Sequence, residues 1–240
     1  MLDLIKMEIL KGKRTSINKI IFIIPVVLLF IAVLLGQGQH GYYNWYYTLI
    51  SPMLLALVSS MAVNREKKLN YKAILLNPIK KQKLWTAKII YIMILYLITC
   101  IFVALLISLL KYIPGPLYFK SKLDISNIFL SMLVIYILNL FQIPIMMILG
   151  DKFNYFIPVV VNIFFTIFGI VKYKNLVYLP YIGLPRVMIL FTDMLPNGLP
   201  YDGLILIDKG EILYSALISI GLFFVFTILG SFIYSRKEVK

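Results

Sequence analysis

Six long apolar segments, separated by polar stretches, dominate the pattern of the chain. They are Ile20–Leu35, Tyr43–Val63, Ile89–Leu110, Ile125–Leu149, Tyr155–Val171 and Ile212–Tyr234. None of them carries Lys, Arg, Asp or Glu in its interior. Because a hydrocarbon core about 30 Å thick requires roughly 20 apolar residues of helix, the pattern predicts an all-α integral membrane protein with six transmembrane helices. Pro25 and Pro144 fall inside these segments, and membrane helices tolerate proline where neighbours satisfy the freed carbonyl.

A seventh apolar segment, Leu176–Leu195, is not expected to span. It contains two prolines in its first half and Arg186 near its centre, and a central Arg costs about 2.5–3.5 kcal/mol on insertion. Further prolines and two Asn-Gly or Asp-Gly pairs cut the surrounding chain into short pieces. We therefore predict that residues 172–211 form an external segment, in which Leu184–Leu195 is a re-entrant or interfacial helix.

The distribution of cations fixes the expected orientation. With six spans, seventeen of the 24 Lys and Arg residues fall on the side of the two termini and seven on the other side. Since cytoplasmic loops accumulate Lys and Arg, both termini are predicted to be cytoplasmic. The formal charge of +14 in a chain that is 61% hydrophobic has the same explanation, so no nucleic-acid partner is expected.

Residues 1–19 are predicted to form an interfacial helix on the inner leaflet, because Leu2, Ile5 and Ile9 recur at helical spacing among charged residues. The alternative is a solvated basic leader without a fixed structure. Either way the segment contributes cations to the cytoplasmic side and contacts membrane lipid.

The largest cytoplasmic loop, residues 64–88, holds eight cations and an apolar stripe. Glu66 to Leu76 fits a short helix that Asn77-Pro78 ends, because proline disfavours helix in the residue before it. Asn77 and Pro78 can then cap and open a second helix that leads into the third span. The apolar residues of the loop, which make it fit for docking into a protein groove, are Leu69, Leu75, Leu76 and Ile79. The alternative is a basic loop with no partner.

The chain lacks the residues of most energy-converting and catalytic sites. No G-x-x-x-x-G-K-[ST] phosphate loop is present, so ATP hydrolysis is expected in a separate subunit. His40, placed in a short outer loop at residues 36–41, and Cys100 are single, so no metal or Cys/His catalytic site is expected. No carboxylate or cation lies within a span, which argues against proton or sodium coupling. The expectation is one permease domain, residues 1–240, without a cofactor or enzymatic activity of its own.

The polar residues at membrane depth are amides and hydroxyls. Asn139 and Gln142 lie three residues apart in the fourth span, hence on one helical face, and Asn162 lies at similar depth in the fifth. These three amides are candidates for a substrate path at a subunit interface. The alternative is hydrogen bonding between helices, worth about 0.6–2 kcal/mol per contact. Ser51-Pro52 and Ser59-Ser60 in the second span fit either role.

Together these features resemble the permeases of ABC-2 type transporters. The resemblance rests on Glu66, the pair Leu75-Leu76, Pro78 and Lys88 around the central loop, and on six spans in 240 residues. The N-terminal run with Glu8, Lys11 and Lys13 is similar to that of small permeases of the lantibiotic and bacteriocin immunity subgroup. The family implies a dimer of two six-span subunits, identical or related, that carries two cytoplasmic ABC ATPase subunits with ATP and Mg. It also implies that the central loop acts as the coupling helix, through Glu66, Leu69, Leu75, Leu76 and Pro78.

The leading functional hypothesis is therefore a permease subunit that exports an amphipathic peptide antibiotic or a lipophilic compound from the membrane for self-protection. A membrane immunity or scaffold protein that binds its target without transport is the alternative. An embedded enzyme is disfavoured because the required carboxylate, His or Cys groups are missing. The richness in Ile, Lys, Asn and Tyr indicates an AT-rich genome, hence the plasma membrane of a low-GC Gram-positive bacterium.

Overall fold

The computed structural model describes residues 1–13, 15–67, 80–112, 123–173, 180–201, 203, 208 and 210–236. All regular elements in these residues are helices, which confirms the all-α prediction. In chain order they are α1 (Leu2–Lys13), α2 (Ile17–Leu34), α3 (Gly38–Trp45), the π-helix η1 (Tyr46–Ile50), α4 (Ser51–Lys67), α6 (Lys81–Leu110), α7 (Ile125–Asn139), α8 (Gln142–Lys152), α9 (Phe156–Lys172), α10 (Pro180–Thr192) and α11 (Gly210–Ser235).

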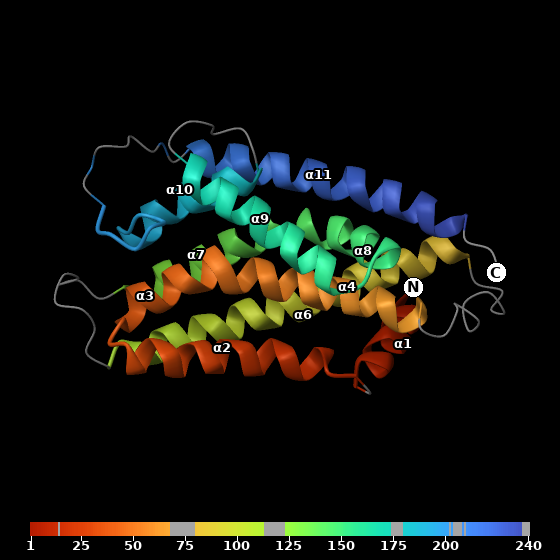
Figure 1. The fold of residues 1–240 in the computed structure, drawn as a ribbon, viewed down its shortest axis with the longest axis horizontal. Coiled ribbons are helices and arrows are strands. Elements are labelled where there is room, and N and C mark those ends of the chain that lie inside the picture. Colours follow the sequence, from red (N-terminus) through yellow and green to blue (C-terminus); the bar gives the residue numbers. More distant parts are fainter. Residues whose placement is uncertain are drawn as a thin grey trace.

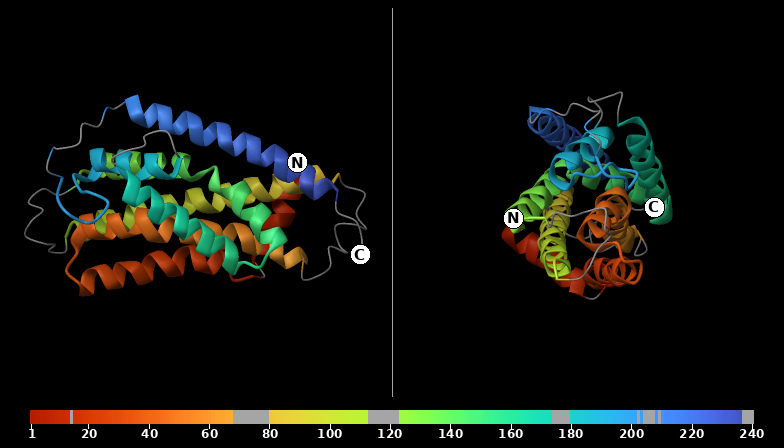
Figure 2. Two further views of the ribbon diagram at one scale, coloured as in Figure 1. Left: turned by 45° about the horizontal axis from the view of Figure 1, so that its top comes forward. Right: turned by 90° about the vertical axis from the view of Figure 1, so that its left-hand side faces the viewer.

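The long helices lie side by side in one elongated bundle (Figure 1). Helix α4 packs against α8 and α9, while α6 packs against α7, α11 and α1, so α4 and α6 form its inner part. Helices α2 and α11 lie on opposite sides (Figures 1 and 2) and turn apolar side chains outward, among them Phe30 and Ile228. Exposed apolar faces of this length suit a lipid environment and would be unfavourable in water.

The contact between α4 and α8 depends on a glycine. A Cβ added at Gly150 would lie 2.7 Å from the Cα of Ser60, so a larger residue would push the two backbones apart. The close approach also lets Asn64 Nδ2 donate to the Gly150 carbonyl at 2.9 Å. A small residue at this point therefore permits both tight packing and a hydrogen bond between the helices.

Length and composition support four or five membrane spans. The continuous helices Ile17–Leu34, Gly38–Lys67, Lys81–Leu110 and Gly210–Ser235 each suffice alone. The pair α7 and α8 makes a fifth span if its two bent parts count as one. Helix α9 is apolar but has 17 residues, which is the lower limit for crossing a bilayer. The six-span count thus stays a prediction that depends on α9.

The expected continuous helix Ile125–Leu149 is wrong in detail, because α7 and α8 meet at a bend of 46°. Pro144 lies in the first turn of α8 and explains the position of the break. Its ring cannot coexist with a helical carbonyl four residues earlier, at Leu140, and it has no N–H to donate. Leu140 and Phe141 accordingly lie between the two helices.

The N-terminal segment also differs from the expectation of one interfacial helix over residues 1–19. Helix α1 ends at Lys13, and residues 17–19 already belong to α2. Helix α1 packs against α6 and buries Glu8, whereas Leu2 of the expected apolar stripe is 74% exposed. The helix is therefore attached to the protein as well as available to lipid.

At the opposite end, the prediction of a loop at residues 36–41 is wrong, and one predicted helix has other bounds. Helix α3 begins at Gly38, so most of the expected outer loop 36–41 is helical, and His40 is buried at 5% exposure, not on the surface. The expected re-entrant helix Leu184–Leu195 is α10, Pro180–Thr192, which starts four residues earlier and lies among α7, α9 and α11 (Figure 1).

Arg186, the residue that argued against a seventh span, lies in α10, where it is buried and forms an ion pair with Glu211. Its Nη2 donates to Glu211 Oε1 at 2.9 Å, and its Nε donates to the other carboxylate oxygen. Glu211 lies in the first turn of α11, where a negative charge also interacts well with the helix dipole. The short helix α10 can thus carry a buried guanidinium, because Glu211 at the start of α11 neutralises its charge.

The orientation can be tested with single cysteines, because the native Cys100 is 2% exposed and provides little background. Asn154, between α8 and α9, and Asn197, in the turn after α10, are both exposed at opposite ends of the bundle. In intact cells, a membrane-impermeant maleimide should label Asn197→Cys and leave Asn154→Cys unlabelled until the membrane is permeabilised. Labelling of Asn154→Cys in intact cells would contradict the predicted orientation.

Candidate functional site

The first candidate site is a charge cluster where α1, α4, α6 and α11 meet. Its members are Glu8, Lys11, Arg65, Glu66, Lys88 and Tyr234. Lys88 lies between two carboxylates: its Nζ is 3.0 Å from Glu8 Oε1 and donates also to Glu66 Oε1. Tyr234 from α11 donates to the second oxygen of Glu66 at 2.7 Å. The cluster therefore joins four helices that are distant in sequence.

Two further cations complete the cluster. Lys11 Nζ lies 2.7 Å from Glu8 and 3.1 Å from Glu66, and Arg65 pairs with the other oxygen of Glu8. Three cations thus face two carboxylates. The side chains of Glu8 and Lys88 are both fully buried, and charges in such surroundings are tolerated only when paired. Removing Glu8 would leave Arg65 without its carboxylate, whereas removing Lys88 would leave Glu8 and Glu66 with only Lys11 and Arg65 as partners.

The pKa of Glu8 shows how the opposing effects balance. Burial acts to raise the pKa of this carboxyl, but the nearby charges of Lys88, Arg65 and Lys11 lower it more, so the pKa lies below the ordinary value of 4.5. A carboxyl whose pKa is lowered by folding stabilises the folded state at any pH above its ordinary pKa. This contribution is lost as the pH falls through the lowered pKa. Glu8 is therefore charged, and the cluster intact, at neutral pH.

The aromatic residues beside the cluster hold α6 and α11 together. Trp85 packs on Tyr234 with ring centroids 5.3 Å apart, and both side chains are buried. The hydroxyl of Tyr234 can reach Glu66 because Trp85 supports its ring. The end of α11 is in this way fixed to the beginning of α6.

The cluster adjoins the expected coupling loop on both sides. Glu66, one of the predicted coupling residues, lies in the last turn of α4, and Lys88 lies in the second turn of α6. The other predicted coupling residues, Leu69, Leu75, Leu76 and Pro78, lie outside the described residues, as does the expected helix boundary at Asn77. Glu8, Arg65 and Tyr234 were not predicted as site residues. The sequence offered one indication of these ion pairs: acidic residues are scarce at the cation-rich end, so each Glu there has several potential partners.

The second candidate site is an amide network at the break between α7 and α8. The structure brings the three predicted path residues together: Gln142 Nε2 donates to Asn139 Oδ1 at 2.8 Å, and Asn162 Nδ2 donates to Gln142 Oε1 at 2.9 Å. Asn139 also donates to the hydroxyl of Tyr96 at 2.9 Å, and Tyr181 donates to Asn162 Oδ1 at 2.6 Å. The network thus runs from α6 through the break to α9 and α10.

The same network reaches α4 through main-chain and hydroxyl groups. Asn162 donates to the carbonyl of Pro52 at 2.7 Å, and the hydroxyls of Ser51 and Tyr96 are 2.6 Å apart. Ser51 and Pro52 thereby take the interhelical role, one of the two that the sequence allowed. Ser60, by contrast, bonds mainly within its own helix, to the Leu57 carbonyl at 3.0 Å.

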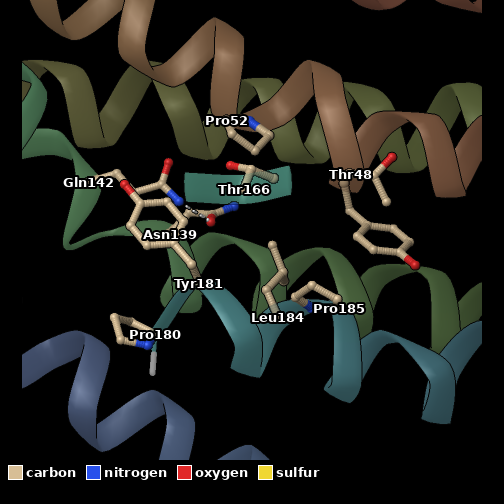
Figure 3. Close-up of a pocket in the computed structure, with 10 residues that line it drawn as sticks. Thr48, Pro52, Asn139, Gln142, Thr166, Pro180, Tyr181, Leu184 and Pro185 are labelled. Carbon is tan, nitrogen blue, oxygen red and sulfur yellow. Dashed lines mark hydrogen bonds between the residues drawn. The ribbon is translucent and has the colours of Figure 1, made fainter. Parts of the chain in front are cut away.

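Little space adjoins the amides in this conformation. Figure 3 shows Asn139, Gln142, Thr166 and Tyr181 around a cavity of about 10 Å³, which is close to the minimum for one water molecule. The three amide side chains are at most 2% exposed. Their mutual hydrogen bonds agree with an interhelical role, and contact with cargo stays a prediction that requires the helices to separate.

Comparison with known protein families gives a match. A family model described as "ABC-2 family transporter protein" matches residues 4–169, which include Glu8 of α1 and the amides Asn139, Gln142 and Asn162 but not Tyr181. No curated protein and no solved structure matches the chain.

The charge cluster predicts a large and non-additive loss of stability. Lys88→Met should lower the thermal midpoint in detergent by about 6–20 °C, because two buried carboxylates lose their common partner, at a cost of about 3–5 kcal/mol. Adding Glu66→Gln to this variant should cost less than it does alone, since Glu66 has then already lost its contact with Lys88. Lys13→Met, at an exposed position of α1, is the control and should change little. Strictly additive midpoints would show that the cluster members act independently.

Proposed function

The chain belongs to the ABC-2 family of transporter membrane proteins, and on this premise we propose that it is the permease subunit of an ATP-driven exporter. The family match covers most of the chain, and the apolar helices support a multi-pass membrane location. Family membership is the single observation that carries the proposal. An ATP-driven exporter of this family would take its energy from a separate ATPase subunit, and this agrees with a sequence that contains no phosphate-binding loop.

The proposed assembly contains two copies of a six-span subunit, identical or related, and two cytoplasmic ABC ATPase subunits that bind ATP and Mg. The loop between α4 and α6 would contact the ATPase through Leu69, Leu75, Leu76 and Pro78. The support is indirect. These leucines lie in a charged loop, outside the six apolar segments, so their apolar side chains are not explained by membrane insertion. Glu66 and Lys88, which flank the loop, pair with each other in the charge cluster.

The mechanism follows from how the cluster connects the helices. A displacement of the ATPase would pull on the ends of α4 and α6, and Glu66 and Lys88 would pass it to α1 and α11. ATP binding and hydrolysis would then favour different arrangements of the spans through differential contacts. The charged ends would move as a unit, because separating them would leave buried charges unpaired.

The proposed cargo is an amphipathic peptide antibiotic of the lantibiotic or bacteriocin type, or a lipophilic compound, taken from the bilayer to protect the cell. The support is that the interiors of the six apolar segments carry no Lys, Arg, Asp or Glu, which fits a cargo that reaches the protein through lipid. Immunity, antibiotic resistance and a Gram-positive source are parts of this proposal.

Docking of the ATPase can be tested by charge insertion. The double substitution Leu75→Asp and Leu76→Asp should abolish co-purification of a co-expressed ABC ATPase partner, because two carboxylates cannot enter an apolar groove. Membrane insertion should be unchanged. Leu199→Asp, at an exposed apolar position at the opposite end of the bundle, is the matched control and should retain the ATPase. A complex that survives the double substitution with normal ATP hydrolysis would place the contact elsewhere.

The role of the amides can be separated from their contribution to stability. If Asn139 and Gln142 line the cargo path, Asn139→Leu and Gln142→Leu should change cargo resistance even after normalisation to the amount of folded complex. The reference is Ser219→Ala, which removes a hydrogen bond from α11 to the Ile137 carbonyl outside the network. Resistance that falls only in proportion to folded protein, as expected for the reference, would reject the path and leave the interhelical role.

A further inference from the structure

A pocket of about 450 Å³ opens at the same end of the bundle as the charge cluster. One wall is the corner between α1 and α2 (Figure 1), and the facing walls are α4 and the residue before α9. The pocket is lined by Thr15, Ser16, Ile17, Met61, Asn64, Arg65 and Tyr155. Arg65 is the one charged residue among these seven, and it belongs to the charge cluster as well. The lining residues therefore bring a positive charge to the pocket and no carboxylate.

The charge of Arg65 is only partly neutralised by the protein. Arg65 pairs with Glu8, but Lys11 and Lys88 contact the same carboxylate, and the cluster holds three cations for two carboxylates. Its Nε and Nη1 have no acceptor among the residues that the structure describes. Both nitrogens are covered by protein atoms, so Arg65 acts on the pocket through its charge and not through these two N–H groups. An anion in the pocket would compensate the surplus positive charge.

Two hydroxyl groups on opposite walls provide donors that a ligand can reach. Ser16 is exposed, and its side chain makes no hydrogen bond with the described part of the chain, not even the usual cap to α2. Tyr155 is 49% exposed, and its hydroxyl is likewise unpaired among the described residues. Each hydroxyl can donate to a phosphate oxygen. The start of α2 adds to this preference, because its first turn has no acidic residue and the positive end of the helix dipole favours an anion.

The position of the pocket indicates where such an anion would come from. Helix α2 is one of the four continuous spans, so its first residues lie where the hydrocarbon core meets the lipid headgroups. The predicted orientation places this end in the cytoplasmic leaflet, which carries the anionic lipids. Ile17 and Met61 line the same pocket and offer an apolar surface next to the hydroxyls. Phosphate groups and acyl chains are thus both present at this level of the membrane.

From this combination we propose that the pocket binds the phosphate headgroup of an anionic phospholipid. The hydroxyls of Ser16 and Tyr155 donate to the phosphate oxygens, Arg65 compensates the negative charge, and the first part of an acyl chain lies against Met61. The bound lipid would connect the corner between α1 and α2 to α4. A soluble phosphate ester carries the same charged group but no acyl chain, so experiment can distinguish the two sources. The proposal does not depend on an ATPase partner or on the cargo.

Native mass spectrometry can test the site, because it counts the lipids bound to each protein molecule. The full-length protein in an uncharged detergent, without any ATPase, is titrated with dihexanoyl phosphatidylglycerol, dihexanoyl phosphatidylcholine and sn-glycerol 3-phosphate. We expect one site at which phosphatidylglycerol binds about tenfold more tightly than phosphatidylcholine, whose choline cation cancels the charge and finds no carboxylate among the lining residues. Glycerol 3-phosphate should bind at least about tenfold more weakly than phosphatidylglycerol, because it has no acyl chain to bury.

A pair of substitutions at Ser16 isolates the effect of charge. Ser16→Glu should weaken phosphatidylglycerol binding about tenfold by repulsion, whereas Ser16→Gln, of the same size but neutral, should weaken it much less. Folding should not interfere, because a carboxylate at the start of a helix is favourable. Tyr155→Phe should cost about fivefold in affinity, as for one hydrogen bond.

Gln82→Glu is the matched control for a general effect of surface charge. It adds a carboxylate at an exposed position in the first turn of α6, at the same end of the bundle but outside the pocket, and should leave lipid binding unchanged. Equal losses in Ser16→Glu and Gln82→Glu, or equal affinities for the two lipids, would overturn the proposal. Glycerol 3-phosphate that binds as tightly as phosphatidylglycerol would assign the pocket to a soluble phosphate ester and would overturn the lipid assignment. Because no ATPase is present, these outcomes are independent of whether the chain serves an exporter.

Discussion

The burial of the Lys88 ammonium is the constraint on which one end of the bundle depends. An ammonium in apolar surroundings must be compensated, and no residue within its own helical turn can do this. Glu8 and Glu66 supply the charge from two other helices, and Tyr234 secures Glu66 from a third. The position of α1 against α6, which an interfacial helix would not need, follows from this requirement. A change at Lys88 therefore affects the arrangement of four helices.

The rule that a buried polar or charged group needs a partner applies at two further levels of the bundle, with different chemical groups. In the middle of the bundle, amides satisfy one another because each carries both donors and an acceptor, so Asn139, Gln142 and Asn162 need no charge. At the other end, Arg186 is held by a bidentate pair with Glu211. Each group of contacts joins helices that are distant in sequence. Hydrophobic burial could not select which helices become neighbours, because in a membrane an apolar helix face meets equally apolar surroundings in lipid.

Much of the architecture was predictable from the sequence, because span length and uninterrupted apolar character are direct consequences of bilayer thickness. The four continuous spans and the short buried α10 follow from this pattern. The bend at Leu140 was not predicted, although Pro144 was noticed, because a membrane helix can either absorb a proline or break at it. The burial of His40 was missed because a six-residue polar stretch with three glycines reads as a loop. Pattern alone does not reveal whether such a stretch has a tertiary partner.

The candidate sites were predictable to different degrees for a similar reason. The amides were identified because a polar residue inside an apolar segment is conspicuous in one dimension. The charge cluster was not: Glu8 and Lys88 were noted only for the family resemblance, and nothing in the sequence indicates that the fold places Lys88 Nζ 3.0 Å from Glu8 Oε1. Their pairing depends on how α1 returns to α6, which is a tertiary property.

The amide network also limits how the bundle can open. Tyr181 of α10 donates to Asn162, so any outward movement of α10 would leave an amide oxygen unpaired at membrane depth. The water-sized cavity beside Gln142 and Tyr181 lies where a water molecule could take over that hydrogen bond. Such an exchange replaces one hydrogen bond by another and avoids most of the cost of an unpaired buried acceptor. The charge cluster has no comparable neutral substitute, since water compensates a buried charge poorly. The hydrogen bond of Tyr181 is consequently the contact of α10 that can be exchanged at lower cost, provided that Arg186 keeps its pair with Glu211, while the ends of α1, α4, α6 and α11 move together.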